Sequence, residues 1–335
     1  MTTIADVLKG LKPGTIQSVG YMQIIPLLSE VGNDKYVLPT EVLISNRNYG
    51  EMQMENPTEG TLIIPFGMGV ITRQSAQDHA TPKAKILKRL EKAHINYAAC
   101  IQQSQGGYLA RGQHPMTILP WAIKGVALET RDDTNYGKLW GAITELNSSL
   151  GASRRGHLEV YLETFKDDLD TFIAQFEIIP NQVGAIVLIN GYIVGIERTP
   201  NSGYFKALWR PLIRESYGSL VLQYRKKFGE TPPIPKTRVP LKGSITSLEE
   251  LKDALEVSKG AEDEIVKIKV RKLVKDKFTS VIEERVGNIQ VQTLGNRQFS
   301  GQVVYDEDKI VYASFITTAS GLKNADVWEA DEFVI

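Results

Sequence analysis

Two short segments rich in amide, carboxylate and imidazole groups each follow an apolar run of the sequence. Gln74, Gln77, Asp78 and His79 come directly after TLIIPFGMGVIT, and Gln102 and Gln103 come after INYAACI. Polar loops that a rigid sheet holds at the ends of its strands often carry ligand-binding groups. The two segments therefore predict a binding site, and ordinary polar turns are the alternative.

Asp78, His79 and Glu197 are the candidates for catalysis. A carboxylate beside an imidazole can orient and charge that ring for acid–base work, and either Asp78 or Glu197 could be a general base. Neighbouring residues of a strand point to opposite faces, so Asp78 and His79 can cooperate only if the chain turns there. Otherwise His79 is a structural or surface histidine.

Cations at two further places could meet an anionic ligand. Arg154, Arg155 and His157 precede a predicted helix, whose N-terminus would add partial positive charge for a phosphate or carboxylate. An exposed turn is the alternative for these residues. Arg198 follows Glu197, and the two form either a substrate contact or a buried ion pair.

Familiar catalytic motifs are absent from the sequence. It contains no Walker A, GxGxxG, GxSxG or HExxH pattern, and its four histidines are scattered without ligand spacing. The lone Cys100 lies in an apolar segment without an adjacent cation, which favours an inert buried thiol. We therefore predict neither a metal site nor a bound cofactor.

The composition indicates a globular protein outside the membrane. The 335 residues carry 39 basic and 39 acidic side chains, and 42% of the residues are hydrophobic. Zero net charge argues against a dedicated nucleic-acid binder, and no apolar run reaches the roughly 20 residues that a membrane span needs. The N-terminus lacks the features of a secretory signal, so we expect a cytoplasmic location.

Hydrophobic spacing and turn residues predict the elements that position these groups. A short helix with a Thr3–Asp6 capping box is expected at 3–10, followed by β-rich runs over 15–72 that form an antiparallel sheet, sandwich-like or barrel-like. A basic helix is expected at 81–94, a strand at 95–102, and further helices at 136–150 and 157–177. The 157–177 segment has the strongest helical pattern of the chain.

The second half predicts a hairpin, a long helix and a strand-rich end. Asn190-Gly191 favours a tight turn between two apolar strands, and 204–227 is expected to be helical with a kink or a new start at Pro211. A capping box predicts a helix at 247–258, and four strands follow it, the first at 264–274. The fold class is therefore α+β, with antiparallel β-rich N-terminal and C-terminal parts and two long helices and a β-hairpin between them.

Composition divides the chain into three parts. Residues 1–228 form the main α+β domain, and residues 229–243 are a proline-rich linker. Residues 244–335 form a small C-terminal region of a helix plus strands, which either stands apart or packs on the main domain.

Several segments resemble those of the ADP-ribosylglycohydrolase- and rhodanese-phosphatase-associated protein domain family. They are LIIPFGMGVITRQSAQDH, INYAACIQQSQGGY, LW…GHLEVYL and VGAIVLINGYIVGIERTPN, together with the helix from 204 and the end FSGQVVYDEDKIVYASF. The resemblance runs from Ile16 to about Lys227 and leaves the final strands open. It implies a setting in NAD and ADP-ribose processing or in prokaryotic conflict systems such as phage defence. It also marks Gln77, Asp78, Cys100, Gln103 and Glu197 as characteristic positions, while His79 stands where the family often has a basic residue.

Three functions remain open at this point. The first is a cytosolic ligand-binding or regulatory protein that recognises a nucleotide, an ADP-ribose-like molecule or a modified partner. The second is a structural or interaction protein that forms an assembly, such as a homo-oligomer. The third is a hydrolase acting on a nucleotide or ADP-ribosyl bond, with His79 or His157 as general acid or orienting group.

Overall fold

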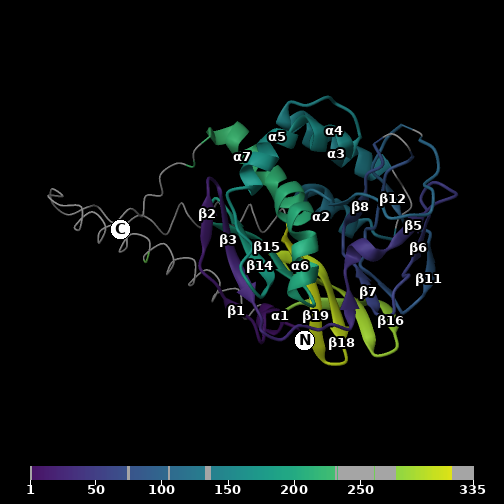
Figure 1. Cartoon of the computed structure of the whole chain (residues 1–335). Helices are drawn as coiled ribbons and strands as arrows, with labels where there is room; N and C mark the ends of the chain where they lie inside the picture. Colours follow the sequence, from purple (N-terminus) through teal and green to yellow (C-terminus); the bar gives the residue numbers. More distant parts are fainter. Residues whose placement is uncertain are drawn as a thin grey trace.

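A nine-stranded antiparallel sheet forms the largest element of the protein (Figure 1). The computed structural model describes residues 2–73, 76–104, 106–132, 137–230, 232, 260 and 277–318. The strand order is β1-β3-β14-β15-β19-β18-β17-β16, and β2 pairs with β3. The strands are β1 (Lys12–Pro13), β2 (Gln17–Val19), β3 (Met22–Leu28), β14 (Gln182–Ile189), β15 (Tyr192–Arg198), β16 (Thr279–Val286), β17 (Ile289–Gly295), β18 (Phe299–Asp306) and β19 (Lys309–Thr317).

The predicted hairpin is confirmed at the centre of this sheet. Asn190 and Gly191 join β14 to β15 with φ values of 50° and 80°, the left-handed backbone that a tight turn requires. The N-terminal strand β3 pairs with β14, and the C-terminal strand β19 pairs with β15. Strands from both β-rich ends of the chain therefore meet in one sheet.

Three smaller sheets hold the rest of the N-terminal strands, whereas the sequence predicted a sandwich-like or barrel-like antiparallel sheet over 15–72. The first contains β10 (Lys85–Leu87), β7 (Thr61–Ile64) and β4 (Tyr36–Val37), and β4 runs parallel to β7. The second contains β11 (Lys92–Ile95), β6 (Met52–Glu55) and β5 (Leu43–Ser45). The third contains β12 (Ala99–Cys100), β9 (His79–Ala80), β8 (Met68–Val70) and β13 (Met116–Ile118).

The basic helix predicted at 81–94 is wrong. Residues 85–87 pair with β7 and residues 92–95 pair with β6, and Leu90 between them has a φ of 54°, outside the helical region. The helix propensity of Lys and Arg is a weak preference of tenths of a kcal/mol. Burying Ile86 and Leu87 against β7 is worth roughly 1.5–3 kcal/mol each, which outweighs that preference.

The helices match most of the predicted ranges. The capping box of Thr3 and Asp6 starts α1 (Ile4–Leu8), and α2 (Trp121–Glu129) and α3 (Gly137–Leu150) follow the small sheets. The segment predicted as one helix at 157–177 is two, α4 (Leu158–Thr164) and α5 (Lys166–Ile173), because the backbone bends at Phe165 (φ −106°, ψ 19°). The predicted helix from 204 is α6 (Ser202–Trp209), a π-helical segment η2 (Arg210–Tyr217) and α7 (Gly218–Phe228). The remaining short helix is η1 (Pro39–Glu41).

The π-helical turns follow from Pro211. Proline has no N–H to donate and its ring clashes with the preceding turn, so the chain widens there without ending the helix. The widened segment buries Arg214, Ser216 and Tyr217. It thereby brings polar side chains into the interior, where Tyr217 donates a hydrogen bond to Glu197.

The nine-stranded sheet packs on both of its faces. α6, η2 and α7 cross one face, and the side chains of α6 share a core cluster with those of β14 and the small sheets (Figure 1). On the other face, Ile4 and Val7 of α1 pack against Ile186 and Phe315. A third cluster lies between the β12-β9-β8-β13 sheet and helices α2 to α5. This mixture of antiparallel sheets and helices is an α+β fold, as the sequence predicted.

Some predicted features lie outside the described residues. These are Gln74, the helix at 247–258, the strand at 264–274 and almost all of the linker at 229–243. The division into a main domain, a linker and a C-terminal region therefore remains a prediction. Within the described part of the chain, no helix combines the length and apolar character needed to cross a membrane.

Candidate functional site

The four-stranded sheet β12-β9-β8-β13 positions the predicted Gln77–His79 segment. His79 and Ala80 form β9, which pairs with β8 on one side and with β12 on the other. The chain turns between β8 and β9, where Arg73 has a φ of 50°. Thr72 closes the turn, since its backbone N–H donates to Asp78 Oδ1 at 2.7 Å and its hydroxyl lies 2.8 Å from the same oxygen.

Asp78 is a buried carboxyl group with one oxygen left over. Its residue is fully buried, and Oδ1 takes both contacts from Thr72. No donor among the described residues reaches Oδ2. Burial raises the pKa of Asp78 to about 6, an effect that the Thr72 hydrogen bonds oppose and that the charge of Glu159 reinforces. Asp78 is therefore an acid that changes charge close to neutral pH.

Gln77 ties the segment to its neighbours through its side-chain amide. Nε2 donates to the Gln102 carbonyl and lies 2.7 Å from Cys100 Sγ, and Oε1 accepts from Gly106 N at 2.7 Å. The backbone N–H of Gln77 donates to Gly107 O at 2.9 Å. All the polar atoms of this buried amide are thus engaged within the protein, and they fix the loop that follows β12.

His79 is held in one tautomer by the backbone. Gly50 N–H donates to Nε2 at 3.2 Å, so this nitrogen is the acceptor, and the proton on Nδ1 points to Gln77 O at 2.9 Å. Burial lowers the pKa of the ring, which keeps it neutral. The neighbouring Asn46 side chain fixes the loop that follows β12 at Leu109, since its Oδ1 accepts from Leu109 N. These contacts give His79 a structural role next to Asp78.

Gln102 and Gln103 join the same network from β12. Gln102 Oε1 accepts from Asp78 N at 3.1 Å, and Asp78 O accepts from Ile101 N at 3.1 Å. Gln103 exchanges two hydrogen bonds with Gly156, from its N–H to Gly156 O at 3.0 Å and from Gly156 N to its Oε1 at 3.1 Å. The predicted segments 77–79, 102–103 and 154–157 therefore come together in space.

His157 and Gly156 complete the junction with the helices. His157 Nε2 accepts from Ser104 N at 3.2 Å, and burial together with the charge of Arg155 lowers the pKa of its ring. A Cβ on Gly156 would stand 2.8 Å from Trp140 Cβ of α3, so only glycine permits this close approach. The side chain of buried Asn147 holds the turn by donating to the carbonyls of Arg155 and His157.

Three exposed arginines adjoin residues of this network in the sequence. Arg154 and Arg155 are exposed at the turn before α4. Arg73 is also exposed, and its Nε lies 3.7 Å from Glu163 Oε1. These are the positions at which a phosphate group would find mobile positive charge beside a fixed polar framework.

Glu197 and Arg198 belong to other surroundings. Glu197 Oε1 accepts from Tyr217 OH at 2.6 Å and lies 3.3 Å from Lys124 Nζ, and both charged residues are buried. Arg198 donates instead to the carbonyls of Val7 and Lys9, near α1. No hydrogen bond or ion pair between described residues joins either of them to the Gln77–Asp78 network. The buried ion pair of Glu197 is formed with Lys124, whereas the sequence suggested Arg198.

The Lys124 cluster was missed by sequence reasoning. Lys124 Nζ also donates to Ser314 Oγ at 2.6 Å and stands 5.0 Å from the centre of the Phe66 ring. Burial lowers the pKa of Lys124, and the charge of Glu197 opposes that shift. The available signal was a single lysine inside the apolar helix WAIKGVAL, at a position that faces the core. Thr72, which binds Asp78, had no comparable signal because only the turn brings it close.

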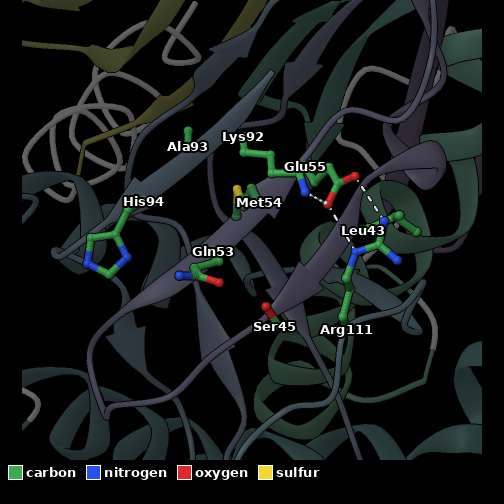
Figure 2. A pocket seen from close by; sticks show the side chains of 9 residues that line it. All are labelled: Leu43, Ser45, Gln53, Met54, Glu55, Lys92, Ala93, His94 and Arg111. Atoms are coloured by element: carbon green, nitrogen blue, oxygen red, sulfur yellow. Dashed lines mark hydrogen bonds and ion pairs between the residues drawn. The ribbon is translucent and has the colours of Figure 1, made fainter. Parts of the chain in front are cut away.

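A pocket of about 320 Å³, lined by both charged and apolar residues, lies elsewhere, on the outer face of the β11-β6-β5 sheet (Figure 2). Arg111 holds Glu55 through two hydrogen bonds of 3.0 and 2.9 Å, and Lys92 Nζ lies 3.4 Å from the same carboxylate. Figure 2 shows Arg111 and Lys92 both directed toward Glu55, with Gln53 between them and His94. The hydrogen bond from Arg111 lowers the pKa of Glu55, which keeps it ionised. Because the Glu55 carboxylate already pairs with both cations, this pocket is less suited to an anionic ligand than the Asp78 region.

The described residues contain no group of three or more His, Cys, Asp or Glu side chains placed to hold a metal ion. Burial raises the pKa of Cys100, as expected for an inert thiol. The chemistry available at the Asp78 region is therefore that of a titrating carboxyl group, fixed amides and nearby guanidinium groups.

Comparison with known proteins places the chain in one family. Residues 10–316 match the model of the ARG and Rhodanese-Phosphatase-superfamily-associated Protein domain. The match includes strands β16 to β19, and so extends past the end of the resemblance predicted from the sequence motifs. No curated protein and no solved structure matches the chain. Because the matched residues include all four sheets and nearly the whole described chain, the protein belongs to the family of ARG and Rhodanese-Phosphatase-superfamily-associated Protein domains.

Proposed function

We propose that the protein binds a small anionic molecule, a nucleotide or an ADP-ribose-like compound, at the network formed by residues 76–79, 102–104 and 154–157. The observation that carries the proposal is Asp78 Oδ2, a buried acceptor that no described residue satisfies. Unsatisfied buried polar atoms cost roughly 1–3 kcal/mol and call for a partner. A ribose hydroxyl or a ring N–H of the ligand supplies the missing donor.

The cations beside the network support the choice of an anionic ligand. Guanidinium groups bind phosphate through paired, charge-assisted hydrogen bonds, and Arg154 and Arg155 stand exposed at the turn that Gln103 holds. The glutamines give the site its rigidity, because Gln77 engages its whole side-chain amide within the protein, and the side-chain oxygens of Gln102 and Gln103 accept from Asp78 N and Gly156 N. Recognition in this proposal therefore rests on Asp78 and the arginines.

The family supports a setting for this activity. Its description names an association with ARG and rhodanese-phosphatase proteins, and reading ARG as ADP-ribosylglycohydrolase is part of our proposal. On that reading the protein works in the cytoplasm beside enzymes that process NAD or ADP-ribose, within a conflict system such as phage defence.

Isothermal titration with ADP-ribose, NAD and cyclic nucleotides tests the proposal. We expect binding by the unaltered protein, and a roughly tenfold or larger loss in Asp78→Ala and Arg155→Ala, since a charged hydrogen bond contributes about 1.5–3 kcal/mol. Arg297→Ala, which removes an exposed arginine on the β17–β18 turn, is the matched control and should bind normally. Heat changes at the level of buffer for the whole panel would refute the proposal.

Hydrolysis of the same ligand is a second candidate, and the titration of Asp78 favours it. A carboxyl group with a pKa of about 6 is partly ionised at neutral pH and can act as a general base. We assign this role to Asp78 in preference to Glu197, whose carboxylate is held by Lys124 and Tyr217. Chromatography of the incubated ligands should then show products, formed about 10²–10⁴-fold more slowly by Asp78→Asn. If the ligands remain intact after prolonged incubation, hydrolysis is refuted and binding is the only function that remains proposed.

A further inference from the structure

The loop that Gln77 fixes carries one exposed aromatic residue, Tyr108, whose ring lies beside the half-buried Tyr49 of a neighbouring segment. The rings of Tyr49 and Tyr108 lie with their centres 5.5 Å apart and their planes at 39°. Tyr108 keeps 57% of its surface exposed, although it is one of the large side chains of the protein. Exposed aromatic rings in a fixed position are the means by which proteins stack planar bases.

Tyr108 is held on both sides along the chain. Before it, Gly107 O accepts from Gln77 N, and Gly106 N donates to Gln77 Oε1. A Cβ on Gly106 would stand 2.7 Å from Gln77 N, so this glycine is needed for the loop to press against the Gln77 backbone. After it, the buried Leu109 exchanges two hydrogen bonds with Asn46. The hydrogen bonds on both sides therefore fix the backbone of Tyr108, and its ring stays exposed in a fixed position.

Tyr49 is anchored to the same network. Its hydroxyl donates to Gly106 O at 2.8 Å, and the next residue, Gly50, donates its N–H to His79 Nε2. The ring that supports Tyr108 is thus fixed to the loop after β12 and to β9. The neutral His79 ring therefore has a structural role: its Nε2 accepts from Gly50 N and holds the Tyr49 segment beside the Asp78 segment.

We infer that Tyr108, supported by Tyr49, is the stacking surface for the planar base of the ligand. The inference rests on the proposed function, and it names the part of the ligand that the Asp78 network does not recognise. Tyr108 and Arg155 attach to one hydrogen-bonded framework through Gln77, Gln102 and Gln103. A base on the tyrosine and a phosphate at the arginine turn are then two ends of one nucleotide-like molecule.

The test compares ligands with and without a base. ADP-ribose, adenosine and ribose 5-phosphate are titrated into the full-length protein and into Tyr108→Ala, Tyr108→Phe and the control Phe228→Ala, which alters another exposed aromatic residue on α7. Stacking on an aromatic ring is worth about 1–3 kcal/mol per base, so Tyr108→Ala should bind ADP-ribose and adenosine roughly 5- to 150-fold more weakly. Tyr108→Phe keeps the ring and should bind normally, and ribose 5-phosphate should not respond to either change.

The outcomes separate this inference from the proposed function. Equal affinity of ADP-ribose for the unaltered protein and Tyr108→Ala overturns the stacking role and leaves the Asp78 site in place. ADP-ribose binding that depends on Tyr108 but not on Asp78 or Arg155 supports the stacking surface and refutes the proposed anionic site. If neither adenosine nor ADP-ribose binds the unaltered protein, both are wrong.

Discussion

At the scale of single residues, the polar side chains that the sequence singled out divide into two kinds. Gln77, Gln102 and His79 spend their hydrogen-bonding groups on the protein itself and act as a framework. Asp78 keeps a buried oxygen without a partner among the described residues, and its pKa lies near 6. Such a group destabilises the fold when it ionises, which is characteristic of functional positions.

Asp78 should make stability depend on pH. Its folded pKa of about 6 exceeds the ordinary 3.8, so its contribution is greatest below pH 3.8 and is lost as pH rises to 6. The shift corresponds to about 3 kcal/mol at pH 8. Asp78→Asn stays neutral and should therefore unfold at higher urea concentration than the unaltered protein at pH 8, by about 1–3 kcal/mol in free energy of unfolding.

The same comparison at pH 4 provides the internal control. The folded proteins are then both largely uncharged at position 78, and their free energies of unfolding should agree within about 1 kcal/mol. Glu30→Gln, at a side chain that is 79% exposed, should follow the unaltered protein at both pH values. An Asp78→Asn protein that is less stable at pH 8 would mean that its surroundings favour the ionised carboxylate.

At the scale of elements, the Lys124–Glu197 pair joins α2 to the nine-stranded sheet. Tyr217 reaches Glu197 from the π-helical segment, and a Cβ on Gly195 would overlap the Tyr217 hydroxyl at 1.8 Å. Ser314 of β19 meets the same lysine. The pair thus fixes how a helix beside the Asp78 sheet is seated on the large sheet, although it contacts no residue of the Asp78 network described above.

Removing one member of this pair should be harmful, and replacing both should be mild. Lys124→Met leaves a buried, unpaired Glu197 and should lower the free energy of unfolding by about 3–5 kcal/mol. Lys124→Met/Glu197→Gln keeps an acceptor for Tyr217 and should recover most of that loss in urea denaturation at pH 7. Lys166→Met, at an exposed pair with Asp170, should change stability by less than about 1 kcal/mol. A double variant as unstable as the single one would show that the charge itself holds the helix.

At the scale of the whole molecule, the two ends of the chain complete one sheet. β19 pairs with β15 through residues 195–198 and carries β18, β17 and β16 beyond it. Val303 and Phe315 of this part are fully buried in the same cluster as Ile4 of α1. The strands after residue 277 are therefore structural partners of the strands before residue 200. Whether copies of the chain assemble into an oligomer stays a prediction for light scattering.

A chain that ends at residue 228 should fail to fold on its own. It would expose the edge of β15 and the apolar face that β17 to β19 cover, which favours aggregation. We expect an insoluble product, or one that binds a hydrophobic dye and unfolds without cooperativity in circular dichroism. A chain that ends at residue 318 keeps every described strand and should unfold cooperatively. Cooperative unfolding of the 1–228 chain would establish it as an independent domain.

Much of the fold follows from local patterns. The Thr3–Asp6 capping box, the Asn190–Gly191 turn and the helix from 204 each depend on residues within one or two turns of chain, and each is present. The helix prediction for 81–94 is wrong because its basic residues favour a helix only weakly. Pairing with β7 and β6, up to about 40 residues earlier in the chain, buries apolar side chains of this segment instead.

For the candidate site, the sequence alone determined which side chains are available: an Asp between a Gln and a His after an apolar strand, two glutamines after another, and arginines before a helix. Only the tertiary structure decided which of them meet. Hydrogen bonds between segments far apart in the chain join Asp78 to Gln102 and Gln103 to Gly156, while Glu197 pairs with Lys124. The physical reason is that burial and pairing depend on distance in space, and it is burial that gives Asp78 its raised pKa.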